Sequence, residues 1–122
     1  MSKSCLVYLQ HILMECEYVT SVVTDELPMY QFLSDETLKR AVTRSLEIVG
    51  EATKKIPVDV KLRWNEIQWK HMAGMRDKLI HDYMGINYLI VWDVAKNIIP
   101  VLIPQIKEVI ENELSNTNET YG

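Results

Sequence analysis

One helical repeat constrains the fold of this chain more than any other feature of its sequence. Small and apolar residues follow one another at steps of four and three: Leu38, Val42, Ser45, Val49, Ala52 and Ile56. This spacing places the six side chains on one face of an α-helix. We therefore predict a helix over residues 35–55, with Ser34 as its N-cap and Pro57 at its end. Gly50 lies inside this helix at a cost of ~1 kcal/mol relative to Ala, which a close neighbouring backbone would explain.

Three further segments carry helical periodicity. Residues 3–24 present one apolar stripe: Leu6, Leu9, Leu13, Cys16 and Val23. Residues 67–84 form a second helix, with Asn65 or a neighbour as its cap and Gly85 as its left-handed C-terminal residue. Residues 88–97 form a third helix with an inward face: Val91, Trp92, Ala95, Ile98, Ile99 and Leu102. Pro100 and Pro104 kink or divide this last segment, and a final helix continues to about Leu114.

No segment shows the alternation of polar and apolar residues that is typical of a strand. Helices joined by short connections favour an all-α, antiparallel four-helix bundle with a kinked or divided C-terminal helix. At 122 residues the chain fits one domain, which we place at residues 1–114. The polar residues 115–122 are expected to form a flexible tail.

The two cysteines indicate a reducing compartment. Cys5 and Cys16 fall three turns apart on the first helix, roughly 16 Å. A disulfide needs Cα atoms within about 7 Å, so these two residues cannot form one. The N-terminus lacks a signal-peptide pattern, and no stretch of about 18 uncharged apolar residues indicates a membrane span. We therefore predict a cytoplasmic protein with no membrane partner.

Charge is distributed unevenly. The net charge is −4, yet residues 54–78 contain seven Lys or Arg against three Asp or Glu, counted from the sequence. Four polar residues lie in the last part of the predicted helix 67–84: Arg76, Asp77, His81 and Tyr83. Asp77 and His81 are one helical turn apart, so Asp77 can orient the imidazole. Arg76 offers a planar cation suited to phosphate oxygens, and Tyr83 shares its face. A solvated helix face is the other explanation of the same pattern.

Three stretches together resemble the HepT branch of the HEPN superfamily. They are "IVGEATKKIP" at residues 48–57, "WNEIQWKHMAGMRDKLIHDYMGIN" at 64–87 and "VWDVAKNIIPVL" at 91–102. Their centre is an R-x-x-x-x-H-x-Y motif, met here by Arg76, His81 and Tyr83. The family often has Asn where this chain has Asp77 and Pro where it has Gln68.

The resemblance implies a homodimeric toxin of a toxin–antitoxin pair that cleaves RNA without a metal ion. Arg76, His81 and Asp77 are then the catalytic residues. The antitoxin is an MntA-like nucleotidyltransferase, which silences the toxin by transferring AMP to Tyr83. A dimer also suits the chemistry, because in-line cleavage needs a base and an acid on opposite sides of phosphorus and each chain offers one motif histidine. Ala73 and Gly74 would allow a close approach of two such helices, or would pack within one chain.

Other residues have simpler interpretations. Lys70, Lys78 and Glu51 are candidate RNA contacts, with ordinary solvation or a salt bridge as the alternative. Trp69 and Trp92 are expected in the core. No His, Cys or Asp cluster has metal-ligand spacing, so we predict neither a metal nor a cofactor. The alternative function is a non-catalytic partner of a nucleotidyltransferase, which the acidic net charge and Asp77 favour.

Overall fold

The computed structural model describes residues 2–80 and 85–121, with side chains described as far as Ser115. Its elements are α1 Lys3–Val22, α2 Met29–Ser34, α3 Glu36–Lys54, α4 Val58–Arg63, α5 Trp69–Ala73, α6 Met75–Leu79, α7 Tyr88–Asp93, the π-helix η2 Val94–Ile98 and α8 Ile99–Tyr121. The described residues form no strand, only an isolated bridge between Ile80 and Ile86. The predicted all-α bundle is confirmed.

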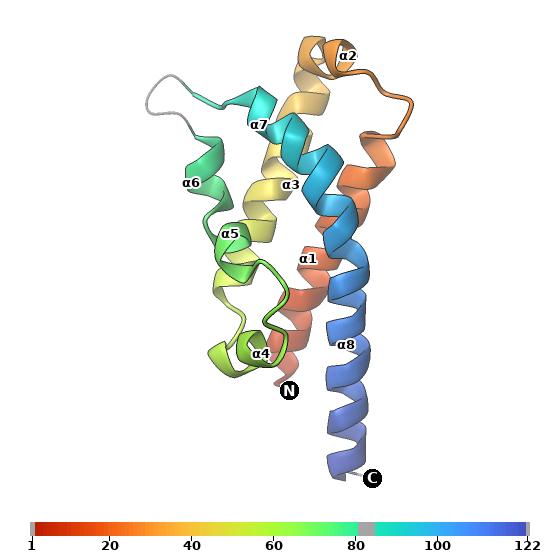
Figure 1. Cartoon of the computed structure of the whole chain (residues 1–122), viewed down its shortest axis with the longest axis vertical. Helices are drawn as coiled ribbons and strands as arrows, with labels where there is room; N and C mark the ends of the chain where they lie inside the picture. The colour runs from red at the N-terminus through yellow and green to blue at the C-terminus, as the bar shows by residue number, and fades with distance from the viewer. Residues whose placement is uncertain (1, 81–84, 122) are drawn as a thin grey trace.

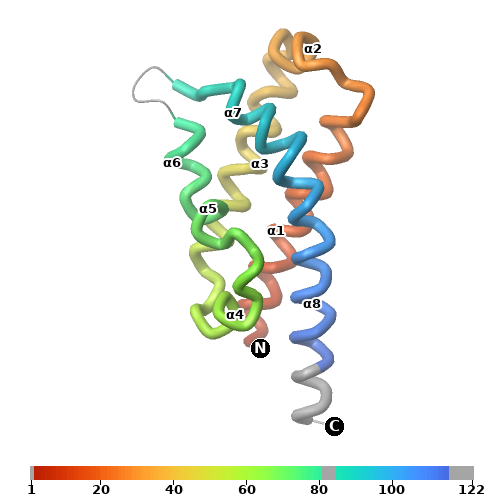
Figure 2. Tube along the Cα trace, in the orientation of Figure 1, coloured from red at the N-terminus to blue at the C-terminus, as the bar shows by residue number. Residues whose placement is uncertain are grey.

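The long helices α1, α3 and α8 form the body of the bundle (Figure 1). α1 packs against both α3 and α8, while α5 and α6 pack on α3. α7 packs on α3 as well, and η2 joins it to α8, so that the chain from Tyr88 onward forms one long, bent helix (Figure 2). The core contains fully buried side chains from these elements: Leu9, Ile12, Val19, Phe32, Val42, Leu46, Val49, Leu79, Ile99 and Ile106.

α1 confirms the predicted helix but buries a slightly different face. Leu9, Cys16 and Val23 of the predicted stripe are buried, whereas Leu6 and Leu13 are half-buried. The remaining buried positions are Cys5, Ile12 and Val19. The shift has a physical reason: α1 contacts α3 and α8 together, so its buried face is centred between two neighbours. Both cysteines are free and buried on this helix, as the spacing predicted.

The start of α3 differs from its prediction by one residue. Asp35 is the N-cap, and its carboxylate accepts the backbone N–H of Leu38 at 3.0 Å. Ser34 is instead the last residue of α2, where its hydroxyl donates to the carbonyl of Gln31 at 3.1 Å. The repeat that predicted α3 is confirmed, because Val42, Ser45, Val49, Ala52 and Ile56 are buried and Leu38 packs at the edge of the core.

The predicted helix over residues 67–84 is wrong in its extent. Gly74 separates α5 from α6, and α6 ends at Leu79. Ile80 is extended, with φ −83° and ψ 126°. The carbonyl of Leu79 accepts the N–H of Asn87 at 2.8 Å, so Asn87 lies next to the end of α6. Residues 81–84, which separate these two residues in the sequence, lie outside the described part of the chain.

The ends of this region also differ from prediction. Gln68 occupies the N-cap position of α5, but its side chain makes no capping hydrogen bond. The predicted Asn65 cap is therefore wrong. Gly85 has a positive φ of 99°, as predicted, but it does not directly follow a described helix. Instead, Asn87 caps α7 by accepting the N–H groups of Leu89 and Ile90.

The C-terminal helix contains the predicted irregularity. η2 ends at Ile98, two residues before Pro100, and the N–H of Ile99 donates to the carbonyl of Val94, five residues earlier. Proline lacks a donor and crowds the preceding turn, which a π-helical turn accommodates. Pro104 lies within α8 without dividing it. α8 reaches Tyr121 rather than ending near Leu114, and the flexibility of residues 115–122 stays a prediction.

The helical stretch Tyr88–Ser115 is long and apolar enough, by length and composition alone, to cross a membrane. One third of its most apolar window is buried inside the bundle. The buried side chains include Val91, Val94 and Leu102, and they belong to the common core with α1 and α3. A core helix of a bundle meets the same criteria, and the absence of a membrane partner stays a prediction.

A polar cluster joins α4 to α8. Both Arg63 and the Trp64 indole donate to the carboxylate of Glu113, at 2.8 to 3.0 Å. Glu113 is 3% exposed, although it is charged. The Trp69 indole donates to the carbonyl of Trp64 at 2.9 Å, which links the cluster to the start of α5. Trp69 is buried and Trp92 packs on the ring of Phe32, so both tryptophans contribute to the core as predicted.

Candidate functional site

α6 presents the motif arginine at the surface. Met75 and Leu79 are buried on one side of this short helix, while Arg76 and Asp77 are exposed. No ion pair or side-chain hydrogen bond of Arg76 is formed within residues 2–80 and 85–115. Its guanidinium therefore takes no part in holding the described fold together. A solvated, permanently charged group of this kind is free to bind an anion.

A close contact with α3 fixes the position of α6. A Cβ atom built on Gly50 would lie 3.1 Å from the carbonyl oxygen of Met72 and 3.6 Å from the Cβ of Met75. A Cβ atom 3.1 Å from a backbone oxygen would force the neighbouring backbone to shift by a few tenths of an ångström, so glycine suits this close approach. The neighbouring backbone that we predicted for Gly50 is therefore present, and it belongs to the segment that carries Arg76. The Ala73 carbonyl lies 3.7 Å from the same point, so Ala73 packs within the chain.

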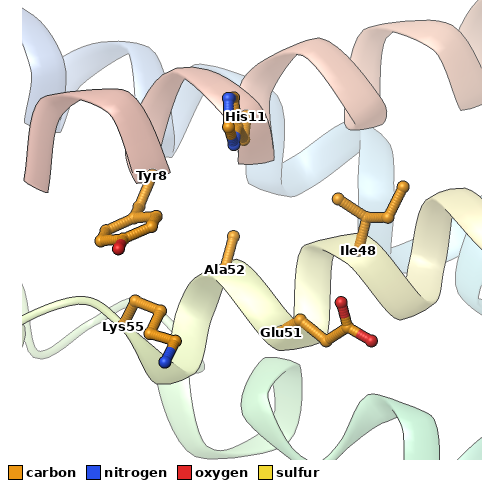
Figure 3. Close-up of a pocket in the computed structure, with 6 residues that line it drawn as sticks. All are labelled: Tyr8, His11, Ile48, Glu51, Ala52 and Lys55. Atoms are coloured by element: carbon orange, nitrogen blue, oxygen red, sulfur yellow. The ribbon is translucent and has the colours of Figure 1, made fainter. Parts of the chain in front are cut away.

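Glu51 follows Gly50 on the exposed side of α3. Its carboxylate lies 3.8 Å from Arg44 in a solvent-exposed ion pair on the same helix. It also lines a cavity of about 220 Å³ between α1 and α3, with Tyr8, His11 and Lys55 (Figure 3). Figure 3 shows the Tyr8 ring facing the Lys55 side chain across this cavity. Glu51 follows Gly50 and Arg76 follows Met75 in the sequence, but the Glu51 carboxylate pairs with Arg44 and faces the cavity between α1 and α3.

The remaining motif residues, His81 and Tyr83, lie outside the described residues. The predicted relation of Asp77 to His81, and of Arg76 to Tyr83, assumed one continuous helix. The described helix ends at Leu79 and Ile80 is extended, so the structure gives no continuous helix on which to base these two relations, and both stay predictions. The helical argument for Asp77 as the group that orients His81 is therefore lost.

The lysines predicted as RNA contacts are exposed. Lys70 lies on α5 and Lys78 on α6. Lys78 lines a cavity between α6 and η2, together with His71 and Ile98. Because Arg76 and Lys78 are two residues apart on one helical turn, their side chains leave α6 in different directions.

Metal-binding geometry is absent from the described residues. Across 2–80 and 85–121 no group of three or more His, Cys, Asp or Glu side chains lies close enough to hold a metal ion. The cluster of Arg63, Trp64 and Glu113 is a strongly polar interior feature that sequence reasoning missed. No local pattern indicates it, because 50 residues separate Arg63 from Glu113.

Comparisons with known proteins identify relatives over most of the chain. A family model described as "Ribonuclease HepT-like" matches residues 12–109. A candidate RNase of Caldanaerobacter subterraneus subsp. tengcongensis is 45% identical over 106 residues, which are 87% of this chain and 94% of that protein. A protein of Thermococcus cleftensis named probable ribonuclease HepT is 43% identical over 84% of this chain and 92% of its own length. No solved structure matches significantly.

Proposed function

Because this chain belongs to the HepT-like ribonuclease family, we propose that it is a toxin that cleaves RNA without a metal ion. In this proposal the ribose 2′-hydroxyl attacks the adjacent phosphorus and the 5′-oxygen leaves, which produces a 2′,3′-cyclic phosphate and a 5′-hydroxyl. A general base takes the proton of the 2′-hydroxyl, and a general acid protonates the leaving oxygen. No water and no external nucleophile take part in this step.

The observation that carries the proposal is the exposed Arg76, which forms no ion pair with any residue that the structure describes, on a helix anchored to α3. The Gly50 contact holds α6 in place, and the buried Met75 and Leu79 leave the guanidinium directed away from the core. A planar guanidinium pairs with two oxygens of a phosphate and stabilises the extra charge of a pentacoordinate phosphorus. Arg76 is assigned this role, and His81 is assigned proton transfer.

A homodimer supplies the second proton-transfer group. In-line displacement places the attacking and leaving oxygens on opposite sides of phosphorus, which one imidazole reaches poorly. Two chains related by a two-fold axis would place two copies of His81 and two copies of Arg76 around one shared crevice. Glu51, which lies next to the Gly50 contact, and Lys70 would then border this crevice. This arrangement requires that α6 of each chain face the other.

The test is cleavage in the presence of EDTA. The purified full chain is incubated with RNA and EDTA, and the products are analysed for 2′,3′-cyclic phosphate ends. We expect cleavage by the parent chain and by H11A, which changes an exposed histidine on α1, and none by H81A. Absence of cleavage by the parent, or equal cleavage by H81A, would contradict the proposal.

Regulation by a nucleotidyltransferase antitoxin is the second part of the proposal. Transfer of AMP from ATP to the Tyr83 hydroxyl forms a phosphodiester and releases pyrophosphate. The added negative charge and bulk next to the motif would compete with RNA phosphate for Arg76. Incubation with such an enzyme and ATP should add the mass of AMP to the parent and to Y30F, which alters a tyrosine that is 75% exposed. Modification of Y83F would contradict the assignment.

A non-catalytic partner of a nucleotidyltransferase is the competing function. The net charge of −4 and the exposed Asp77 beside Arg76 favour it, because both weaken attraction for RNA. The two experiments separate the functions. AMP transfer without any RNA cleavage would support the competing function, whereas cleavage that H81A abolishes would reject it.

A further inference from the structure

An apolar groove runs between α5–α6 and η2–α8. It consists of two adjacent cavities of about 250 Å³ each, and Gln68, Met72 and Ile98 line both of them. We call it the amide groove. Its floor is apolar, since Met72 is 1% exposed and Leu102 is 3% exposed. Small-molecule sites in proteins enclose roughly 300–1,000 Å³, a range that the two cavities together reach.

Side-chain amides surround this apolar floor. Gln68 and Gln105 border the groove, and neither side chain makes a hydrogen bond within residues 2–80 and 85–115. Asn97 donates its Nδ2 to Asp93 at 2.8 Å, which leaves its carbonyl oxygen as an acceptor. Amide groups provide donors and acceptors together. A nucleobase combines an apolar face with an edge that needs both.

The charge of the groove changes along its length. Lys78 and His71 line the end nearest the motif, and Glu66 lines the far end. Lys78 lies on α6, two residues after Arg76, so the basic end of the groove and the proposed site share one short helix, although the two side chains leave it in different directions. A nucleotide whose phosphate lies at Lys78 would match this polarity. The carboxylate of Glu66 disfavours a phosphate at the opposite end.

We infer that the amide groove binds one nucleobase of the RNA substrate, with the ring over Met72 and Ile98 and the adjacent phosphate at Lys78. This inference rests on the proposed RNA substrate and adds a source of base preference to it. Gln68 and Gln105 read the edge of the base. The protein then distinguishes bases on one side of the scissile bond, although Arg76 itself recognises only phosphate.

Nuclear magnetic resonance of the side-chain amides tests the groove without requiring cleavage. The probes are the four nucleoside 3′-monophosphates, added to the full-length, ¹⁵N-labelled chain. We expect saturable shifts of the Gln68 and Gln105 side-chain resonances with at least one probe, while Gln10 on α1 does not respond. Ribose 5-phosphate, which lacks a base, should leave the groove amides unchanged. Equal shifts with ribose 5-phosphate, or no shifts with any nucleotide, would overturn the inference.

A pair of substitutions tests whether the nucleotide binds in the amide groove. Val101 lines the groove and is 59% exposed, so V101E places a carboxylate beside the base without disturbing the core. We expect nucleotide affinity to fall about tenfold or more. V58E makes the same change at a valine of α4 that is 70% exposed and remote from the groove, and it should bind as the parent does. Equal affinities of V101E and V58E would contradict the assignment.

The outcomes separate this inference from the proposed function. A chain that cleaves RNA but shows no groove response contradicts only the inference. A chain that binds nucleotides in the groove but never cleaves RNA contradicts only the nuclease. Size-exclusion chromatography of V101E tests the competing occupant, a second copy of the chain. If V101E changes a dimer into a monomer while nucleotides still bind V101E normally, the groove is an interface and the inference is wrong.

Discussion

α3 approaches the segment that carries the motif closely at Gly50 and Met72, where an added Cβ would be 3.1 Å from the Met72 carbonyl oxygen. The contact joins residues 22 positions apart in the sequence. It explains why a residue that weakens helices occurs in the middle of α3. It also positions α6, since Met75 contacts the same point at 3.6 Å.

Replacing Gly50 should therefore disturb stability and activity together. G50V adds branched carbon atoms against the Met72 and Ala73 carbonyl oxygens, which belong to backbone and cannot rotate away. We expect a loss of about 1–3 kcal/mol in the free energy of unfolding, measured by urea denaturation. RNA cleavage should fall as well, because α6 is displaced. G74A is the control, since its Cβ would meet the Lys70 and His71 carbonyl oxygens at 3.4 and 4.0 Å, which are ordinary van der Waals distances. A G50V chain as stable as the parent would refute the close contact.

Removal of the motif guanidinium should affect chemistry alone. Arg76 is exposed, so R76A should change the free energy of unfolding by no more than about 0.5 kcal/mol. Loss of a group that stabilises transition-state charge should lower the RNA cleavage rate about 100- to 1,000-fold. R40A removes another exposed arginine, on α3, and should cleave as the parent does. A parent-like rate for R76A would exclude Arg76 from the reaction.

The Arg63–Glu113 cluster should make stability depend on pH. Burial raises the pKa of Glu113, but the hydrogen bonds from Arg63 and Trp64 outweigh it and leave the pKa below its ordinary value of 4.5. A lowered carboxyl pKa stabilises the fold fully above pH 4.5, and this stabilisation is lost as pH falls through the folded-state pKa.

E113Q tests this linkage. At pH 7 the variant should lose about 1–3 kcal/mol of unfolding free energy, because a charge-assisted hydrogen-bond pair becomes neutral. The difference from the parent should shrink as urea unfolding is repeated at pH values below 4.5. E108Q, on the exposed face of α8, should show no such convergence. A difference that stays constant with pH would argue against a charged Glu113.

The cysteines should be unreactive in the folded chain. Burial, with smaller contributions from Glu15 and Glu17, raises the pKa of Cys16 to about 12. Burial likewise raises the pKa of Cys5. Because the thiolate is the reactive form, a thiol reagent at pH 8 should label neither residue rapidly. Both should react at once in guanidinium. Rapid labelling of Cys16 in the native protein would contradict its place in the core.

The motif residues illustrate how far local sequence could predict the site. The residue types and spacing of the motif, together with the flanking stretches, indicated the family, and the comparisons confirmed it. The exposed position of Arg76 followed from the apolar spacing of Met75 and Leu79 around it. The end of the helix at Leu79 could not be predicted from local sequence. The Leu79 carbonyl accepts the N–H of Asn87 instead of the N–H of a residue one helical turn later.

The sequence by itself determined that the chain forms a helical bundle and which face α3 buries, since a 3.6-residue period is a property of neighbours along the chain. The stripe from Val42 to Ile56 needed no tertiary information. Only the tertiary structure decided where α6 ends, that Glu113 is the partner of Arg63, and which amides surround one groove. Such contacts join residues far apart along the chain, and their energies depend on how whole helices pack, which no local period encodes.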